Sequence, residues 1–125
     1  MALLVTVVDD DASVRQSLNR LIRSARHEVK LFASAEEFLE WSRAHKPDCL
    51  ILDVRLPGMS GPELHRHLIG QDYHVPTIFI TAHGSDEAAR EAASSDWTVA
   101  YLIKPFGGDE LLDAVEAALK WKKGS

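Results

Sequence analysis

Acidic residues close two apolar runs of this chain. Residues 9–11 are all aspartate and follow the run 3–8, and Asp53 ends the run 49–52. Each acid stands where a buried strand would leave the core. Carboxylates gathered at one edge repel each other unless a cation joins them. The pattern therefore predicts a divalent metal, with one carboxylate held ready for chemistry.

Two further strand ends add a hydroxyl and a cation. The run 77–81 closes on Thr81, and the run 99–104 closes on Lys104. Together with the acids, these groups suit phosphoryl transfer to a carboxylate. Mg²⁺, which prefers oxygen ligands, would shield Asp53 so that an anionic donor can approach. Thr81 and Lys104 would each bind a phosphoryl oxygen.

The elements that must position these groups are short. Continuous apolar runs predict buried parallel strands, and the alternating run 28–32 predicts an edge strand. Helical stripes and capping patterns lie between the strands, with Asp11 expected to cap the first helix. The strands are expected at about 3–8, 28–32, 48–53, 76–81 and 99–104, the apolar stripes at Val14, Leu18, Leu21, Ile22 and at Leu111, Leu112, Val115, Leu119, and two further helix starts at Ser34 and Ser60.

Five strands alternating with five helices predict a three-layer α/β fold with a parallel sheet, formed as a single domain over residues 1–125. In open parallel sheets, sites form outside the carboxyl ends of the strands, where the strand order reverses. The acids at 9–11 and 53 stand at such ends. The predicted fold and the predicted chemistry therefore coincide.

Composition excludes several classes. The net charge of −5 argues against a nucleic-acid-binding surface. The single cysteine, Cys49, lies in an apolar run and has no partner for a disulfide. No stretch of about 18 apolar residues is present, so a soluble, cytoplasmic protein without membrane contact is expected. The histidines at 27, 45, 65, 67 and 74 show no metal-ligand spacing and are expected to be solvated.

Four spaced motifs resemble the receiver domain of two-component response regulators. They are Val-Val-Asp-Asp at 7–10, Leu-Asp-Val-Arg-Leu-Pro-Gly-Met-Ser-Gly at 52–61, Ile-Thr-Ala at 80–82 and Lys-Pro-Phe at 104–106. The resemblance covers nearly the whole chain and looks closest to receivers of transcription regulators. It implies a flavodoxin-like sheet with strand order 2-1-3-4-5.

The resemblance implies roles for the acidic residues. Asp53 is the phosphoacceptor, and Asp10 coordinates Mg²⁺ (or Mn²⁺) together with Asp53. Asp9 assists through water, and Arg55 supplies its backbone carbonyl to the metal. Arg55 and His83 stand at positions that tune phosphoryl lifetime in this family.

Other implied roles concern the switch. Thr81 and Lys104 bind the phosphoryl group, Tyr101 takes the aromatic switch position, and the Lys104–Pro105 peptide bond is cis. A histidine kinase or phosphotransferase is the donor, and a homodimer forms through the last two helices and strands. Residues 94–98, Ser-Ser-Asp-Trp-Thr, depart from the small residues usual before the last strand. This departure concerns the signalling face, not the acidic site.

Two alternatives compete with this reading of the motifs. A haloacid-dehalogenase-like phosphatase would also use Asp, Thr, Lys and Mg²⁺, but it places a second acid two residues after the nucleophile, where this chain has Arg55. An unphosphorylated pseudo-receiver would act only as a protein-interaction module. Retention of every acceptor-site residue argues against that second alternative.

Overall fold

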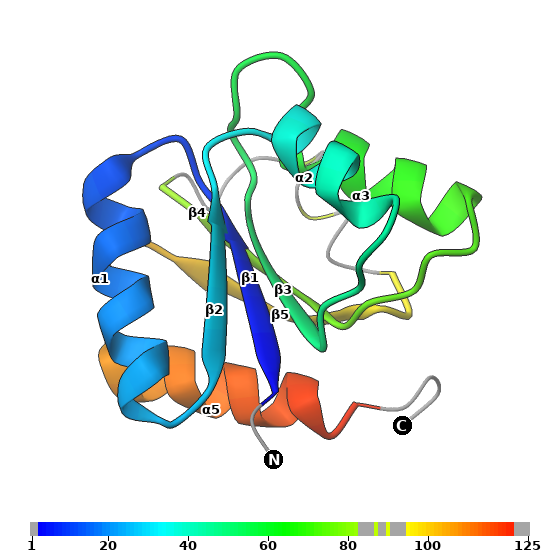
Figure 1. The fold of residues 1–125 in the computed structure, drawn as a ribbon. Helices are drawn as coiled ribbons and strands as arrows, with labels where there is room; N and C mark the ends of the chain where they lie inside the picture. The colour runs from blue at the N-terminus through cyan, green and yellow to red at the C-terminus, as the bar shows by residue number, and fades with distance from the viewer. Residues whose placement is uncertain (1–2, 83–86, 88–89, 91–94, 122–125) are drawn as a thin grey trace.

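The computed structural model describes residues 3–82, 87, 90 and 95–121 (Figure 1). These residues form five strands and four helices. The strands are β1 (Leu4–Val8), β2 (Glu28–Phe32), β3 (Cys49–Asp53), β4 (Thr77–Thr81) and β5 (Thr98–Ile103). The helices are α1 (Ala12–Ser24), α2 (Ala35–Ser42), α3 (Gly61–Gly70) and α5 (Gly108–Leu119).

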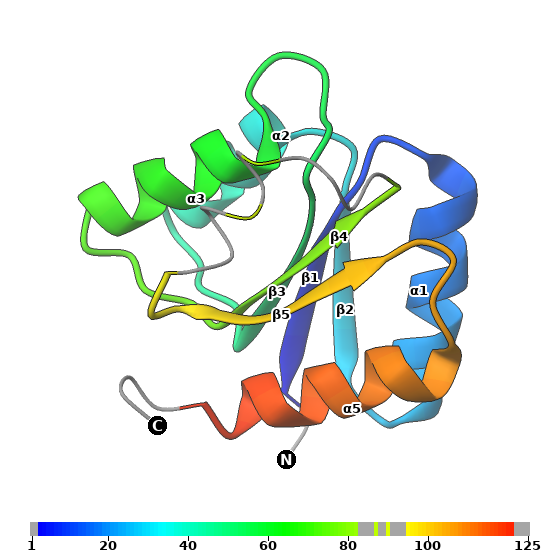
Figure 2. The same cartoon turned by 180° about the vertical axis from the view of Figure 1, so that it is seen from behind.

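All strand pairs are parallel, and the sheet order is β2-β1-β3-β4-β5. Helices α1 and α5 cover one face of the sheet, and α2 and α3 cover the other (Figures 1 and 2). The three layers, the strand order and the edge position of β2 confirm the fold expected from the sequence. The expected fourth helix falls largely on residues outside the described part of the chain.

The core consists of two apolar clusters, one on each face of the sheet, because the side chains of a strand alternate between its faces. Strand β3 shows this alternation in full: every one of its residues is buried. Leu50 and Leu52 pack toward α2 and α3, whereas Cys49 and Ile51 pack toward α1 and α5. Burial on both faces is the reason that the central strands read as continuous apolar runs.

Local signals in the sequence set where the helices begin. The Asp11 carboxylate accepts hydrogen bonds from the backbone N–H groups of Ser13 and Val14, at 2.8 and 3.4 Å, and so caps α1 as expected. Ser60 and Glu63 form a complete capping box at the start of α3. These caps fix the helix starts directly after the loops that leave β1 and β3.

One expectation about the histidines is wrong. His65 is only 2% exposed, with Nε2 3.0 Å from Ser95 Oγ and its ring edge-on to Phe79. Its position follows from helical spacing, because Leu64, His65 and Leu68 form one buried stripe of α3. Burial, assisted by the charge of Arg66, lowers the pKa of His65 to about 4. The ring is therefore neutral at pH 7.

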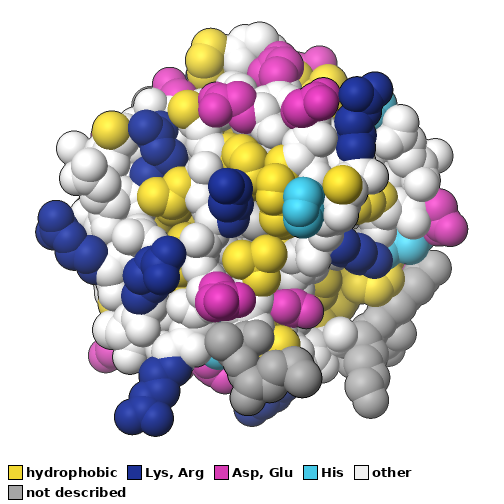
Figure 3. All heavy atoms as spheres, viewed as in Figure 1, with side chains coloured by type: hydrophobic (Ala, Val, Ile, Leu, Met, Phe, Trp, Pro, Cys, Tyr) yellow, Lys and Arg dark blue, Asp and Glu magenta, His cyan; other side chains and the backbone are white. Residues whose placement is uncertain are grey.

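The surface in Figure 3 carries charges of both signs. On this face, basic and acidic side chains are interspersed around hydrophobic ones, with no single basic patch. Within the described residues, every helix is too short or too polar to cross a bilayer.

Candidate functional site

The parallel register brings the acids together. Val8 pairs with Leu52 across β1 and β3, so the next residues, Asp9 and Asp53, lie side by side at the carboxyl end of the sheet. Asp9 is fully buried and Asp53 is 5% exposed, whereas Asp10 is exposed. One carboxylate oxygen from each of the three lies within 4.8 Å of the others. The strand ends thus build the acidic cluster expected from the sequence.

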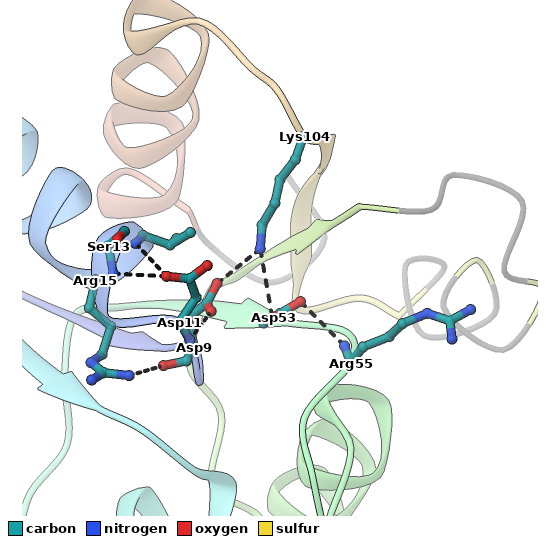
Figure 4. A network of polar contacts seen from close by, with 8 residues as sticks. Asp9, Asp11, Ser13, Arg15, Asp53, Arg55 and Lys104 are labelled. Atoms are coloured by element: carbon teal, nitrogen blue, oxygen red, sulfur yellow. Dashed lines mark hydrogen bonds and ion pairs between the residues drawn. The ribbon is translucent and has the colours of Figure 1, made fainter.

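Lys104 joins this cluster from the far end of the chain (Figure 4). Its Nζ lies 3.1 Å from Asp9 Oδ2 and 3.7 Å from Asp53 Oδ2. The backbone N–H of Lys104 donates to the Thr81 carbonyl at 2.7 Å, which holds the start of the loop after β5 against β4. The Lys104–Pro105 peptide bond is cis, as expected. The Lys104 ammonium therefore lies close to two of the three carboxylates, those of Asp9 and Asp53.

The surroundings of Asp53 disfavour its ionised form. Burial is the largest cause, followed by the charge of Asp9, and together they raise the pKa of Asp53 to about 6. Lys104 and the Arg55 N–H, which donates to Asp53 Oδ1 at 3.3 Å, oppose this rise. At pH 7 most Asp53 side chains are ionised, at a cost that a further cation would relieve.

The donor set fits a hard divalent cation. The cluster offers carboxylate oxygens from Asp9, Asp10 and Asp53, which are the ligands that Mg²⁺ prefers. Both oxygens of Asp9 already have partners, since Oδ1 accepts from the Asp11 N–H at 2.9 Å and Oδ2 from Lys104. Asp53 has comparable partners, the Arg55 N–H at 3.3 Å and Lys104 at 3.7 Å. Among the described residues no hydrogen bond reaches the Asp10 carboxylate, so Asp10 is better placed than Asp9 for direct contact with a cation.

Three of the remaining expected site residues lie in the described part of the chain: Arg55, Thr81 and Tyr101. Thr81 ends β4 and is fully buried, next to the strand that ends on Asp53. The Arg55 side chain is exposed and extends away from the acids in Figure 4. Tyr101 is half-buried against the apolar cluster on the face of the sheet that α2 and α3 cover. Its hydroxyl is buried and has no hydrogen-bond partner among the residues described. His83 lies outside the described residues.

Three residues that support the site were not singled out in the sequence. Arg15 Nη1 donates to the Asp9 backbone carbonyl at 2.7 Å. Glu36 accepts from the Met59 N–H at 3.0 Å and so ties α2 to the loop after Asp53. At Gly61 a Cβ atom would collide with the Asp53 carbonyl oxygen. Gly61 closes the motif at 52–61, and Arg15 left a second signal, because a cation in the first turn of a helix opposes the helix dipole.

Comparison with known proteins defines the class. The family of response regulator receiver domains matches residues 5–116. Nodulation protein W of Bradyrhizobium diazoefficiens is 47% identical over 115 residues, which are 92% of this chain and 50% of that protein. Transcriptional regulatory protein FixJ of the same species is 38% identical over 116 residues, which are 93% of this chain and 56% of that protein.

The solved structure of response regulator StyR is 44% identical to this chain, with a TM-score of 0.84, and the match covers 96% of this chain and 60% of that one. The chain belongs to the family of response regulator receiver domains. It spans about half the length of the curated relatives named above.

Membership of this family confirms the resemblance seen in the motifs and the kinship with transcription-regulating response regulators. It also confirms, at the level of the family, the expectation of a phosphorylation-dependent switch. Neither the pseudo-receiver nor the phosphatase is favoured by these matches.

Proposed function

We propose that Asp53 accepts a phosphoryl group from a histidine kinase or phosphotransferase protein, and that the chain acts in the cytoplasm as one switching domain over residues 1–125. The observation that carries this proposal is the position of Asp53 at the end of β3. There its carboxylate lies beside Asp9 and 3.7 Å from Lys104 Nζ. A carboxylate at this place can attack an incoming phosphorus atom beside a cation that pairs with the phosphoryl oxygens.

The chemistry is nucleophilic displacement. A carboxylate oxygen of Asp53 forms the new bond to phosphorus, while the bond from phosphorus to the donor's imidazole nitrogen breaks and that nitrogen keeps the electron pair. With a pKa of about 6, Asp53 is ionised in most molecules at pH 7 and can attack without a separate base. Lys104 is close enough to pair with a phosphoryl oxygen, and Thr81 ends the adjacent strand.

We assign the metal ligands to Asp10, Asp53 and the backbone carbonyl of Arg55, with Asp9 acting through water. A bound Mg²⁺ or Mn²⁺ would neutralise the charge that builds up as an anionic donor approaches. The support is the separation of at most 4.8 Å between the three carboxylate oxygens. Arg55 and His83 are proposed to tune how long the phosphoryl group survives.

The switch is proposed to act through Thr81, Tyr101 and Lys104. A phosphoryl group shifts an equilibrium only through contacts that differ between the two states. Moving from mostly inactive to mostly active takes about 5.5 kcal/mol, and two charge-assisted hydrogen bonds of roughly 1.5–3 kcal/mol each approach that figure. The responding face would be formed by the last two helices and strands, and a homodimer through this face is the proposed result.

The test is phosphorylation by a small donor. Incubation with acetyl phosphate and Mg²⁺ should add one labile phosphoryl group to the wild type, measured by intact mass. Asp53→Asn should gain none, because an amide oxygen is a far weaker nucleophile. Asp113→Asn, a matched change at an exposed site on α5, should be phosphorylated like the wild type. A phosphoryl adduct on Asp53→Asn would refute the assignment.

A further inference from the structure

The acidic site is held by a cation from the first turn of α1. Arg15 is the fourth residue of that helix, and its Nη1 donates to the Asp9 carbonyl oxygen at 2.7 Å (Figure 4). A positive charge at a helix N-terminus is electrostatically unfavourable, since the helix dipole is positive there. The contact with Asp9 compensates for this unfavourable placement.

Every polar group of Asp9 takes part in a hydrogen bond. Its N–H donates to the Phe32 carbonyl at 3.1 Å, and its carboxylate oxygens accept from the Asp11 N–H and from Lys104. Arg15 donates a hydrogen bond to the remaining polar group, the carbonyl oxygen. That carbonyl is buried with the rest of Asp9, so losing its donor would leave a buried acceptor unsatisfied.

The carbonyl of Asp9 belongs to the same planar peptide unit as the N–H of Asp10. Holding the oxygen therefore fixes the orientation of the plane from which Asp10 continues. Asp10 is exposed, and its side chain has no cap or strand bond of its own among the interactions described, unlike Asp9 and Asp11. This peptide plane is therefore one constraint on the direction in which its carboxylate projects.

We propose that Arg15 is a positioning residue of the metal site: its guanidinium holds the Asp9–Asp10 peptide plane so that the Asp10 carboxylate faces Asp53. The inference rests on the proposed function, in which Asp10 is a metal ligand. Arg15 touches no ligand oxygen in this arrangement and acts only through the backbone.

The direction in which Mg²⁺ affinity changes when Arg15 is removed distinguishes a positioning role from a purely electrostatic one. A guanidinium near three carboxylates repels a cation, and within about 10 Å this repulsion is only partly screened. If Arg15 acted by charge alone, its removal would strengthen Mg²⁺ binding. If Arg15 positions Asp10, its removal weakens Mg²⁺ binding although a repulsive charge has gone.

The experiment measures Mg²⁺ affinity of the metal-stripped protein by isothermal titration calorimetry, with no phosphodonor present. Arg15→Gln shortens the side chain so that it no longer reaches the carbonyl, and we expect about fivefold weaker binding, less than the roughly 10–100-fold loss for a partner bonded directly to a ligand. Arg20→Gln makes the same charge change at an exposed position of α1 and should bind as the wild type does. Arg15→Lys keeps the charge with a shorter reach, and weaker binding by this variant also supports positioning.

Urea unfolding in EDTA serves as the second readout. If Arg15→Gln loses stability but binds Mg²⁺ at least as tightly as the wild type, the contact is only structural and the inference is wrong. Should Arg15→Gln fail to fold, Arg15→Lys decides in the same way. Asp10→Ala tests the underlying assignment separately: equal Mg²⁺ affinity in Asp10→Ala and the wild type would overturn the proposed metal site itself.

Discussion

At the scale of single residues, the site is a group of like charges compensated, within the described residues, by the ammonium of Lys104. Asp9 and Asp53 are buried, and Lys104 lies between them. Burial, together with the charge of Asp9, raises the pKa of Asp53, so its carboxyl is more easily protonated than usual. A second cation beside the proposed nucleophile would offset this effect by favouring the ionised carboxylate.

The raised pKa of Asp53 predicts a pH dependence in the metal-free protein. The pKa of Asp53 is raised to about 6 in the folded state, so the folded state binds the proton more tightly than the unfolded state does. Its contribution to stability is therefore present at low pH and is lost as pH rises from about 4 to about 6. We therefore compare the free energy of unfolding of Asp53→Asn with that of the wild type. The difference should move in favour of Asp53→Asn by about 1–2 kcal/mol from pH 4.5 to pH 7.5, allowing for solvent screening.

Urea unfolding in EDTA at several pH values measures this difference. The comparison between variants is needed because His65, whose pKa is lowered to about 4, contributes with the opposite sign: its stabilisation is lost as pH falls. Asp113→Asn, at an exposed site of α5, is the control. A difference between Asp53→Asn and the wild type that stays constant from pH 4.5 to 7.5 would contradict the prediction.

At the scale of elements, the site depends on how closely α3 approaches the end of β3. The α3 helix begins at Gly61, where any side chain would meet the backbone carbonyl of Asp53. Ser60 and Glu63 fix this start through the capping box. The loop between Asp53 and α3 is therefore held at both ends, by the strand and by the capped helix.

Gly61→Ala should destabilise the fold by about 1–3 kcal/mol, because a backbone carbonyl cannot move aside as a flexible side chain can. Gly70, at the other end of α3, has open space where an added methyl group would lie, so Gly70→Ala should be neutral or stabilising by up to about 1 kcal/mol. Urea unfolding of the two variants tests this. Equal effects at both positions would mean that the close approach is unimportant.

Elements and strand-end residues could be predicted from the sequence, because burial on both faces leaves a continuous apolar signal and a polar residue marks where it stops. Asp53 ends β3 as expected, and Lys104 lies one residue beyond β5, which ends at Ile103. The capping role of Asp11 was likewise local and was predicted correctly.

Contacts that join distant segments could not be predicted in this way. The hydrogen bond of Glu36 to the Met59 N–H and the collision at Gly61 depend on how helices sit against the sheet, which no local period encodes. The prediction for His65 failed because a polar residue type on a helix says less about burial than its place in the apolar stripe does.

At the scale of the whole molecule, strands β4 and β5 connect the acidic site to the apolar cluster on the face of the sheet that α2 and α3 cover. Thr81 and Ile103 pair at the carboxyl ends of β4 and β5, and Phe79 pairs with Tyr101 two residues earlier. Tyr101 packs against the same cluster that receives residues from α2 and α3. A change at Lys104 can therefore reach a partly buried aromatic side chain through one strand.

The proposed switch predicts a response beyond the acids. Addition of beryllofluoride, a phosphoryl mimic, should alter amide hydrogen exchange in peptides covering residues 95–106, and sedimentation should shift toward a dimer. Asp53→Asn provides the control and should show neither change. Exchange differences confined to peptides around Asp53 would rule out transmission through β5.

The Lys104–Asp9 ion pair joins residues 95 positions apart in the chain. During synthesis the ribosome releases the acids at 9, 10 and 53 long before the lysine. The nascent chain thus carries its acidic strand ends without the ammonium that compensates them, and β5 must dock before the charges balance. Lys104 therefore joins the acidic site only after the segment that forms β5 has been made.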